Sequence, residues 1–348
     1  MRNVFFHDRN LRRVFYGNIF FLFILAIELT ENPGQPGNTK KWMTMNPRAM
    51  YRIPSKVIKG LLVFFLPFLL LNCTQHPASD SAKSGNMILS VDPQLEEIAG
   101  IQAETFSRFY PDARITLMPA SSAKSLKHLL DGKVKAALIS GEPEAGESAL
   151  FAQQKQPIRL EPVARDAIVC IVNSDNPAIM LTTKQLEALF SARGQKGTIP
   201  LVARDNFRLL SVLAASTGKK RAELQPWACT SDAELIERVS ADKQAFGLLF
   251  QSSLNGALDR SLKQGKNHNN IRILPLAKVS AGAEAYLPTQ QNIYERRYPL
   301  VATVYYVYYP GDALAAGFGS WLSSAGQKAF ERSSLAPYRL VERTIILK

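Results

Sequence analysis

The sequence predicts an α/β fold, in which a mainly parallel sheet is flanked by helices. Short apolar runs alternate with amphipathic segments from residue 86 onward, which is the pattern of strands that follow helices in a parallel sheet. Small polar residues stand before many amphipathic segments, and proline or glycine follows several of them, as expected of helix starts and stops. No repeat of fixed period occurs, so the pattern favours one irregular α/β arrangement over a repeat array.

The first predicted elements are a strand at 87–91, a helix and a strand at 115–118. Asp92 is a helix cap and Pro93 suits the first helical turn, and the helix carries apolar residues from Leu95 to Phe109. The next elements are a helix at 123–130, capped by Ser121 and Ser122, and a strand at 134–140 that ends at Gly141.

The predicted elements of the second half begin with an apolar strand. In chain order they are a strand at 167–172, a helix at 184–190, a strand at 199–202, a helix at 207–215, a helix from Asp232, strands at 246–250 and 271–275, a β-rich run at 299–309, helices at 313–322 and 326–332, and a strand at 340–347. The helix from Asp232 begins with Ser231 and has Glu234 at the capping-box spacing.

The composition is that of an ordinary globular protein, with 46% hydrophobic and 20% charged residues over 348 positions, and the length leaves room for about two domains. Residues 1–72 hold 10 Lys/Arg against 3 Asp/Glu, so they carry +7 of the formal charge of +13 and leave +6 for the remainder. No dense basic stripe with interleaved aromatic residues occurs in that remainder. We therefore expect no nucleic-acid partner, whereas a moderate positive charge is compatible with small anions.

Residues 50–72 are typical of a secretory signal peptide. Arg52, Lys56 and Lys59 precede the apolar run 61–71, which is too short to span about 30 Å of hydrocarbon comfortably. The run ends in Leu-Leu-Asn-Cys, which resembles a bacterial lipobox and predicts lipidation of Cys73. We therefore expect a lipid-anchored protein on the periplasmic or extracellular face of the cell envelope, with the polar residues 73–85 as a tether.

A second apolar run, residues 14–29, lies upstream of this signal. Two export signals in one chain would be redundant, so our hypothesis is that translation starts at Met45 or Met50 and that residues 1–49 are an extension outside the fold. The alternative is a membrane hairpin.

The chemistry-bearing residues do not favour an enzyme. Three cysteines and four histidines occur without zinc-ligand spacing, and no nucleophile elbow or triad spacing is present. We expect no metal and no cofactor. Pairing of Cys170 with Cys229 stays open, because sequence does not supply the geometry of a disulfide.

Small polar or basic residues follow several predicted strands. In open α/β sheets ligands bind beyond the carboxyl ends of strands, where helix starts present unpaired N–H groups. Hydroxyl, amide and guanidinium donors that converge there would hold an oxyanion. The candidate ligand-binding residues are Ser90, Ser121, Ser122, Ser140, Arg204, Asn206 and Arg208. Taken singly, each serine is explained by helix capping alone, and an exposed arginine is usually only a solvated surface charge. Glu142, Glu144 and Glu147 are interpreted as a solvated loop.

Residues 86–348 resemble a known family in the order of several segments. The segments are 105–111 (TFSRFYP), 121–130 (SSAKSLKHLL), 166–177 (DAIVCIVNSDNP), 181–190 (LTTKQLEALF), 297–300 (RYPL) and 317–327 (GFGSWLSSAGQ). In this order they resemble the phosphate-type (PstS-like) substrate-binding lipoproteins of ABC transporters, in the periplasmic binding protein type 2 superfamily. The resemblance implies two lobes joined by a two-strand hinge, with lobe one at 86–165 plus 277–348 and lobe two at 166–276.

The resemblance further implies a monomer that captures phosphate or a related small oxyanion and delivers it to an ABC transporter permease. The chain departs from the family at three places: 119–122 lack a Gly-rich turn, 139–142 lack a buried Asp, and 203–208 lack a Ser-Gly-Thr stretch. A different anion, a peptide-like ligand or loss of binding therefore stay open. The alternative function is a sensory or envelope interaction protein that keeps the scaffold without transport.

Overall fold

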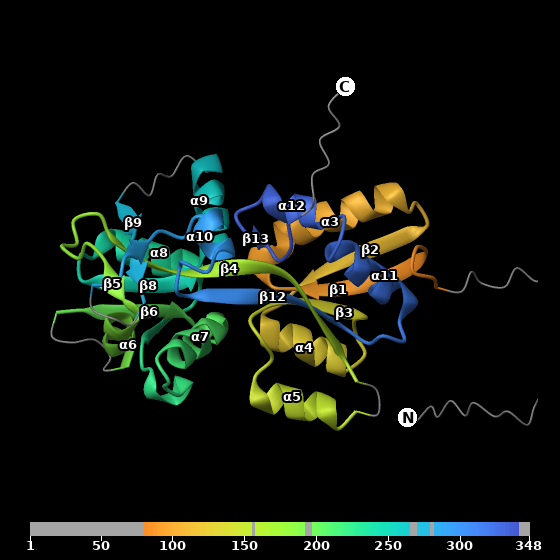
Figure 1. Cartoon of the computed structure of the whole chain (residues 1–348), viewed down its shortest axis with the longest axis horizontal. Helices are drawn as coiled ribbons and strands as arrows, with labels where there is room; N and C mark the ends of the chain where they lie inside the picture. The colour runs from red at the N-terminus through yellow and green to blue at the C-terminus, as the bar shows by residue number, and fades with distance from the viewer. Residues whose placement is uncertain (1–79, 155–156, 192–196, 265–269, 279–281, 341–348) are drawn as a thin grey trace, which may run out of the picture. The chain divides into compact units, whose positions relative to one another are not determined.

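The computed structural model describes residues 80–154, 157–191, 197–264, 270–278 and 282–340 (Figure 1). The chain divides into two compact units, Met1–Thr74 and Gln75–Lys348, and every described residue belongs to the second unit. The predicted extension, the signal peptide, the lipidated Cys73, most of the tether and most of the strand predicted at 340–347 lie outside the described residues. Among the helices that are described, none is long and apolar enough to cross a membrane.

The first half of the unit is a parallel sheet covered by helices on both faces. Strand β1 (Gly85–Val91) pairs in parallel with β2 (Ala113–Pro119) and β3 (Ala136–Ser140). Helix α3 (Glu96–Phe109) follows a 3-10 turn (Pro93–Leu95), while α4 (Ser122–Leu130) and α5 (Ala145–Ala152) follow β2 and β3.

Alternate residues of β3 belong to different cores. Ala136 and Leu138 pack in a core with Phe106 of α3, whereas Ile139 packs with Leu129 of α4. Side chains of a strand point alternately to its two faces, so α3 and α4 cover opposite faces of this sheet (Figure 1).

The second half repeats the arrangement around its own core. Strand β6 (Ile199–Ala203) pairs in parallel with β7 (Trp227–Cys229) and β8 (Ala245–Phe250). The helices are α6 (Thr183–Ser191), α7 (Arg208–Ser216), α8 (Asp232–Ala241) and α9 (Gln251–Lys263). A separate small sheet consists of β5 (Leu181–Thr182), β10 (Leu276–Ala277) and β11 (Ala285–Tyr286).

Two long antiparallel strands join the halves. Strand β4 (Arg159–Asn173) pairs with β12 (Val301–Tyr308), and the register shifts between Val304 and Tyr305. β12 also pairs with β3, whereas β4 pairs with β8 and with the short β9 (Ile271–Ile273). The strand order is therefore β2-β1-β3-β12-β4-β8-β6-β7, and in Figure 1 these two strands run between the halves.

We call the part around β1–β3 lobe one and the part around β6–β8 lobe two. The remaining helices α11 (Ala313–Leu322) and α12 (Gln327–Glu331) supply core residues to lobe one, while α10 (Gln290–Tyr294) supplies Ile293 to the core of lobe two. β13 (Ala336–Pro337) pairs with β4. The predicted α/β class with a mostly parallel sheet and flanking helices is confirmed.

Candidate solute-binding cleft

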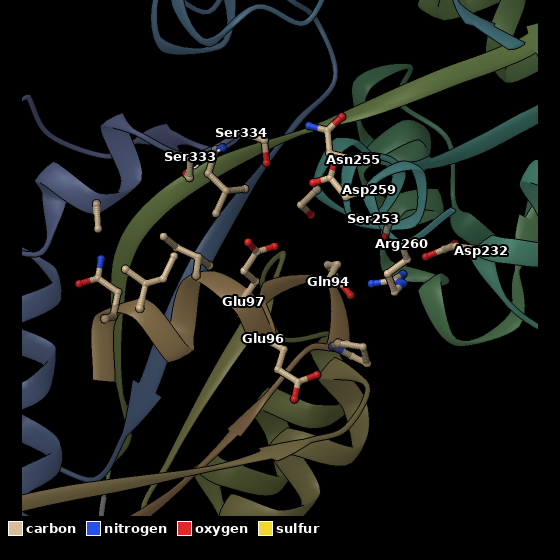
Figure 2. Close-up of a pocket in the computed structure, with 18 of the residues that line it drawn as sticks. Gln94, Glu96, Glu97, Asp232, Ser253, Asn255, Asp259, Arg260, Ser333 and Ser334 are labelled. Atoms are coloured by element: carbon tan, nitrogen blue, oxygen red, sulfur yellow. Dashed lines mark hydrogen bonds between the residues drawn. The ribbon is translucent and has the colours of Figure 1, made fainter. Parts of the chain in front are cut away.

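A cleft of about 1490 Å³ opens between helices of the two lobes. Lobe one lines it with Gln94, Ser121 and residues of α3 and α12, and lobe two with residues of α8 and α9 and the turn after β6. Figure 2 shows Gln94 and Glu97 facing Asn255, Asp259 and Arg260 across this space, whereas the Glu96 side chain points away from them. Strands β6, β7 and β8 all end at the cleft, where ligands of open α/β sheets bind.

Asp92 organises the ends of the three parallel strands in lobe one. It follows β1 and is 3% exposed. Its Oδ2 accepts hydrogen bonds from the main-chain N–H of Ser140 at 2.9 Å, from the Ser122 hydroxyl and from Gln94 Nε2 at 3.3 Å. Gln94 Nε2 also donates to Ser140 Oγ at 3.0 Å. Burial raises the pKa of Asp92 to about 6, against the opposing effects of the hydrogen bonds and of the Arg208 charge.

Asp232 organises the corresponding edge in lobe two. It is the first residue of α8, and its carboxylate accepts from Asn206 Nδ2 at 2.9 and 3.1 Å. Burial raises the pKa of Asp232, and hydrogen bonds from Ser253 and Asn206 oppose this shift. The neighbouring Ser231 accepts from the Glu234 N–H at 3.2 Å, so the serine half of the predicted capping box is confirmed. The Glu234 carboxylate accepts from the Thr230 N–H instead of the Ser231 N–H.

A third buried carboxyl, Asp166, lies under the start of α9. It is fully buried on β4 and accepts from the Ser252 hydroxyl and from the Ser252 N–H at 3.4 Å. Burial raises its pKa to about 7, and the bonds from Ser252 lower it only in part. Each lobe thus turns hydrogen-bond donors at its strand ends toward a carboxyl of its own.

Arg208 does not line the cleft but connects the lobes. It is 4% exposed, donates from Nη1 to the Glu142 carbonyl at 2.5 Å and pairs through Nη2 with Glu147 at 2.5 Å. Near it, the Ser211 hydroxyl donates to Glu144 at 2.6 Å and Arg221 lies 3.2 Å from the same carboxylate. The interpretation as a solvated loop is therefore wrong for Glu144 and Glu147, because they begin α5 and pair with arginines of lobe two, whereas Glu142 is exposed.

The seven candidate binding residues are thus distributed over several places. Ser121 and Asn206 line the cleft, and Ser122 and Ser140 lie behind it on Asp92. Ser90 is buried and donates to the Met118 carbonyl and to Ser125 Oγ. Arg208 joins the lobes, and Arg204 is exposed.

Sequence reasoning missed Ser252 and Ser253, which both line the cleft. A signal was present in the chain: the apolar run 245–250 is followed at once by Gln-Ser-Ser, as an earlier strand is followed by Ser121 and Ser122. The missed carboxyls are Asp166, which directly precedes the apolar run 167–172, and Asp92 and Asp232, which sequence reasoning placed at helix starts.

Metal-ligating side chains do not gather in the described part of the chain. Over those ranges, no group of three or more His, Cys, Asp or Glu side chains is arranged to hold a metal ion. Cys170 and Cys229 are both buried free thiols.

Comparisons with known proteins point to solute-binding proteins. The phosphate-binding protein PstS of Pseudomonas aeruginosa, in two strains, is 32% identical over 114 residues, which are 32% of this chain and 35% of the relative. The match thus spans about a third of these curated relatives.

Two solved structures share the fold. A phosphate ABC transporter substrate-binding protein from Clostridium perfringens, solved with bound phosphate, superposes with a TM-score of 0.58 at 16% identity over 73% of this chain and 100% of its own. An ABC-type phosphate transport receptor from Vibrio cholerae gives a TM-score of 0.55 at 16% identity over the same shares of the two chains. At this level of identity the likeness establishes the fold.

The family follows from a longer match. The model of the PBP superfamily domain matches residues 76–325, which include every strand and helix described above except α12 and β13. The two-lobed architecture joined by β4 and β12 agrees with this match. The chain therefore belongs to the PBP superfamily, with the type 2 fold of its phosphate-binding neighbours.

Proposed function

We propose that this protein is the solute-binding component of an ABC transporter, which captures a small polar solute in the cleft between its lobes and delivers it to a membrane permease. The observation that carries this proposal is the cleft itself, into which strand ends and helix starts of both lobes open. Its relatives support it, since the similar proteins are named as phosphate-binding and transport proteins. No catalytic step is part of the proposal.

A small oxyanion such as phosphate is the first solute class to test. The N-terminus of α4 at Ser121 and the N-termini of α8 and α9 border the cleft, and such helix ends favour negative charge. The oxyanion and the permease are predictions that derive from the family, and the residues proposed to face the solute are Ser121, Asn206 and Ser253.

Titration calorimetry tests solute capture directly. The purified protein is titrated with phosphate, sulfate and a panel of neutral and cationic polar solutes at low ionic strength. Saturable binding of one solute per chain, weakened by Asn206→Ala and unchanged by Gln154→Ala on the exposed surface, is the expected result. An affinity that is the same in Asn206→Ala as in the wild type would place the solute outside this cleft and contradict the proposal.

We also propose that Cys73 carries the lipid that anchors the protein to the cell envelope. Replacement Cys73→Ser removes the thiol that the lipobox presents, so metabolic labelling with a radioactive fatty acid should be lost and the protein should move from the membrane to the soluble fraction. Cys229→Ser serves as the control that changes a buried thiol and keeps the label. Retention of the label in Cys73→Ser would contradict the anchor.

The permease distinguishes transport from the alternative of a sensory or envelope interaction protein. Cross-linking in intact cells, followed by mass spectrometry, should recover a membrane permease and its ATPase with the anchored protein. Recovery of envelope proteins alone, without a permease, would favour the alternative.

A further inference from the structure

The donors at the strand ends of lobe one converge on a single atom of the chain itself. The Ser140 N–H, the Ser122 hydroxyl and the Gln94 amide all donate to Oδ2 of Asp92. They come from β3, from the start of α4 and from the turn before α3, which are the three places where an anion bound beyond this sheet would find its donors. The carboxylate therefore stands where lobe one would hold an oxyanion.

This carboxylate is buried and is charged at pH 8. Asp92 is 3% exposed, and its pKa of about 6 leaves it ionised at that pH. The cation that acts on it is Arg208, whose guanidinium is already paired with Glu147 and with the Glu142 carbonyl. A second negative charge beside Asp92 would thus not be neutralised by Arg208, because this guanidinium already pairs with Glu147. Two like charges in a poorly solvated place repel each other strongly.

The cleft lining, behind which Asp92 lies, is also acidic. Its lining carries more carboxylates than cations: the former are Glu96, Glu97, Asp205, Asp232 and Asp259, and the latter are Arg260, Lys328 and Arg332. In lobe two the Asn206 amide is turned toward Asp232 in the same way as the donors of lobe one are turned toward Asp92. A solute that brings hydroxyl or ammonium donors would complement these acceptors, whereas a dianion would compete with them.

We infer that Asp92 is a specificity residue, whose carboxylate occupies the lobe-one half of the anion-binding arrangement and selects against multiply charged oxyanions in favour of solutes that donate hydrogen bonds. The inference rests on the proposed function, because it takes the cleft as the solute site. The inference restricts the class of solute that the cleft would bind. The chain keeps the scaffold of its phosphate-binding relatives, and the carboxylate of Asp92 takes the hydrogen-bond donors that would otherwise bind an oxyanion. Inorganic phosphate is then the probe and not the physiological solute.

Phosphate titration of Asp92 variants at pH 8 and low salt tests this inference. Wild-type protein should show no saturation by phosphate up to millimolar concentrations. Asp92→Ala frees the three donors and removes the charge, so its affinity for phosphate should rise by about tenfold or more, as expected for a site relieved of a like charge. Asp92→Asn removes the charge and keeps the side-chain shape, and should give a smaller rise. Asp112→Asn, an exposed carboxylate in the turn after α3, makes the same change in net charge and should leave phosphate binding as in wild type.

Two outcomes would overturn the inference. Tight phosphate binding by the wild type that Asp92→Asn weakens would make Asp92 a contact of the anion, and would leave solute capture intact. Equal absence of phosphate binding in wild type, Asp92→Ala and Asp92→Asn would show that Asp92 controls nothing in the cleft. A cooperative thermal unfolding transition establishes that each variant is folded. If Asp92→Ala does not fold, the comparison of Asp92→Asn with the wild type decides the result. Failure of solute capture itself is a separate result, since it requires that no solute of any class binds the wild type.

Discussion

The buried carboxyl of Asp166 is expected to make the stability of the folded protein depend on pH. It lies on β4 with no exposed surface, and it accepts hydrogen bonds from the hydroxyl and the N–H of Ser252. These bonds oppose the effect of burial only in part, so burial dominates and raises the pKa of Asp166 from 3.8 to about 7. In the folded protein the neutral acid is favoured, and ionisation above that pH acts against folding.

Replacing Asp166 should alter how stability depends on pH. Because the folded-state pKa is raised, Asp166 binds its proton more tightly in the folded than in the unfolded chain, and its favourable contribution is complete below about pH 4 and is lost as pH rises to about 7. The free energy of unfolding of the wild type should therefore fall across this interval, by at most about 4 kcal/mol from this group. Asp166→Asn should remove much of that fall and raise the melting temperature at pH 8 relative to wild type. An unchanged pH profile in Asp166→Asn, beside an unchanged Asp112→Asn control, would contradict the raised pKa.

Residue type alone predicts part of the site and not the rest. Ser121 and Asn206 follow strands in the sequence and do line the cleft, because strand ends meet at one edge of a sheet. Nothing local in the sequence tells that Asp92 and Ser122, which are 30 positions apart, come together behind that edge, or that Arg208 faces Glu147 across the lobes. The first contact depends on the pairing of β1 with β2 and β3 inside lobe one, and the second on how β4 and β12 place the two lobes. Both are long-range properties of the fold.

At the scale of elements, the contact of α8 with β8 depends on a glycine. A Cβ atom at Gly247 would lie 2.6 Å from Leu235 Cδ2 and 2.9 Å from Val239 Cγ2 and Ile171 Cγ1. Two of these atoms belong to α8, so the helix packs directly on the strand at this position.

Gly247→Ala should destabilise the protein by about 1 to 3 kcal/mol, because overpacking forces α8 away from the sheet. Gly146→Ala is the matched control: Gly146 lies in α5, and a Cβ atom added there would have nothing within 4 Å, so alanine should be neutral or stabilising by up to about 1 kcal/mol. Urea unfolding of both variants measures the difference. Equal stability of Gly247→Ala and wild type would mean that α8 does not pack as described.

Elements with strong patterns are predictable, whereas short or irregular ones are not. The apolar run 167–172 predicts the core of β4, but the strand extends from Arg159 to Asn173, since its polar first half pairs with β12. Helices α5 and α9 were not predicted. α5 has two turns and begins with Glu144 and not with Ser, Thr, Asn or Asp, and α9 contains Gly256 and Asn255, which lower helix propensity.

At the scale of the whole molecule, Arg208 links lobe two to lobe one at a place separate from the cleft lining. Both of its terminal nitrogens reach the segment 142–147, while Arg221 and Ser211 reach Glu144 of the same segment. Lobes of binding proteins move about a hinge, so charged contacts of this kind influence which arrangement of the lobes is favoured.

Arg208→Ala should reduce the free energy of unfolding by about 2 to 3 kcal/mol, because it leaves Glu147 and the Glu142 carbonyl without their charged partner. Arg238→Ala removes an exposed ion pair with Glu234 and should change stability by no more than about 0.5 kcal/mol. Hydrogen exchange should in addition become faster in α5 of Arg208→Ala. Similar effects of the two substitutions on unfolding would contradict a buried link between the lobes.

Native mass spectrometry of the protein purified from its own cell envelope tests most directly whether the cleft holds the solute. The wild type should carry one non-covalent solute of defined mass, and Asn255→Trp, which fills the cleft from α9, should carry none. Gln154→Trp, on the exposed surface after α5, should retain it. The same solute on Asn255→Trp as on the wild type would place binding outside the cleft and contradict the account.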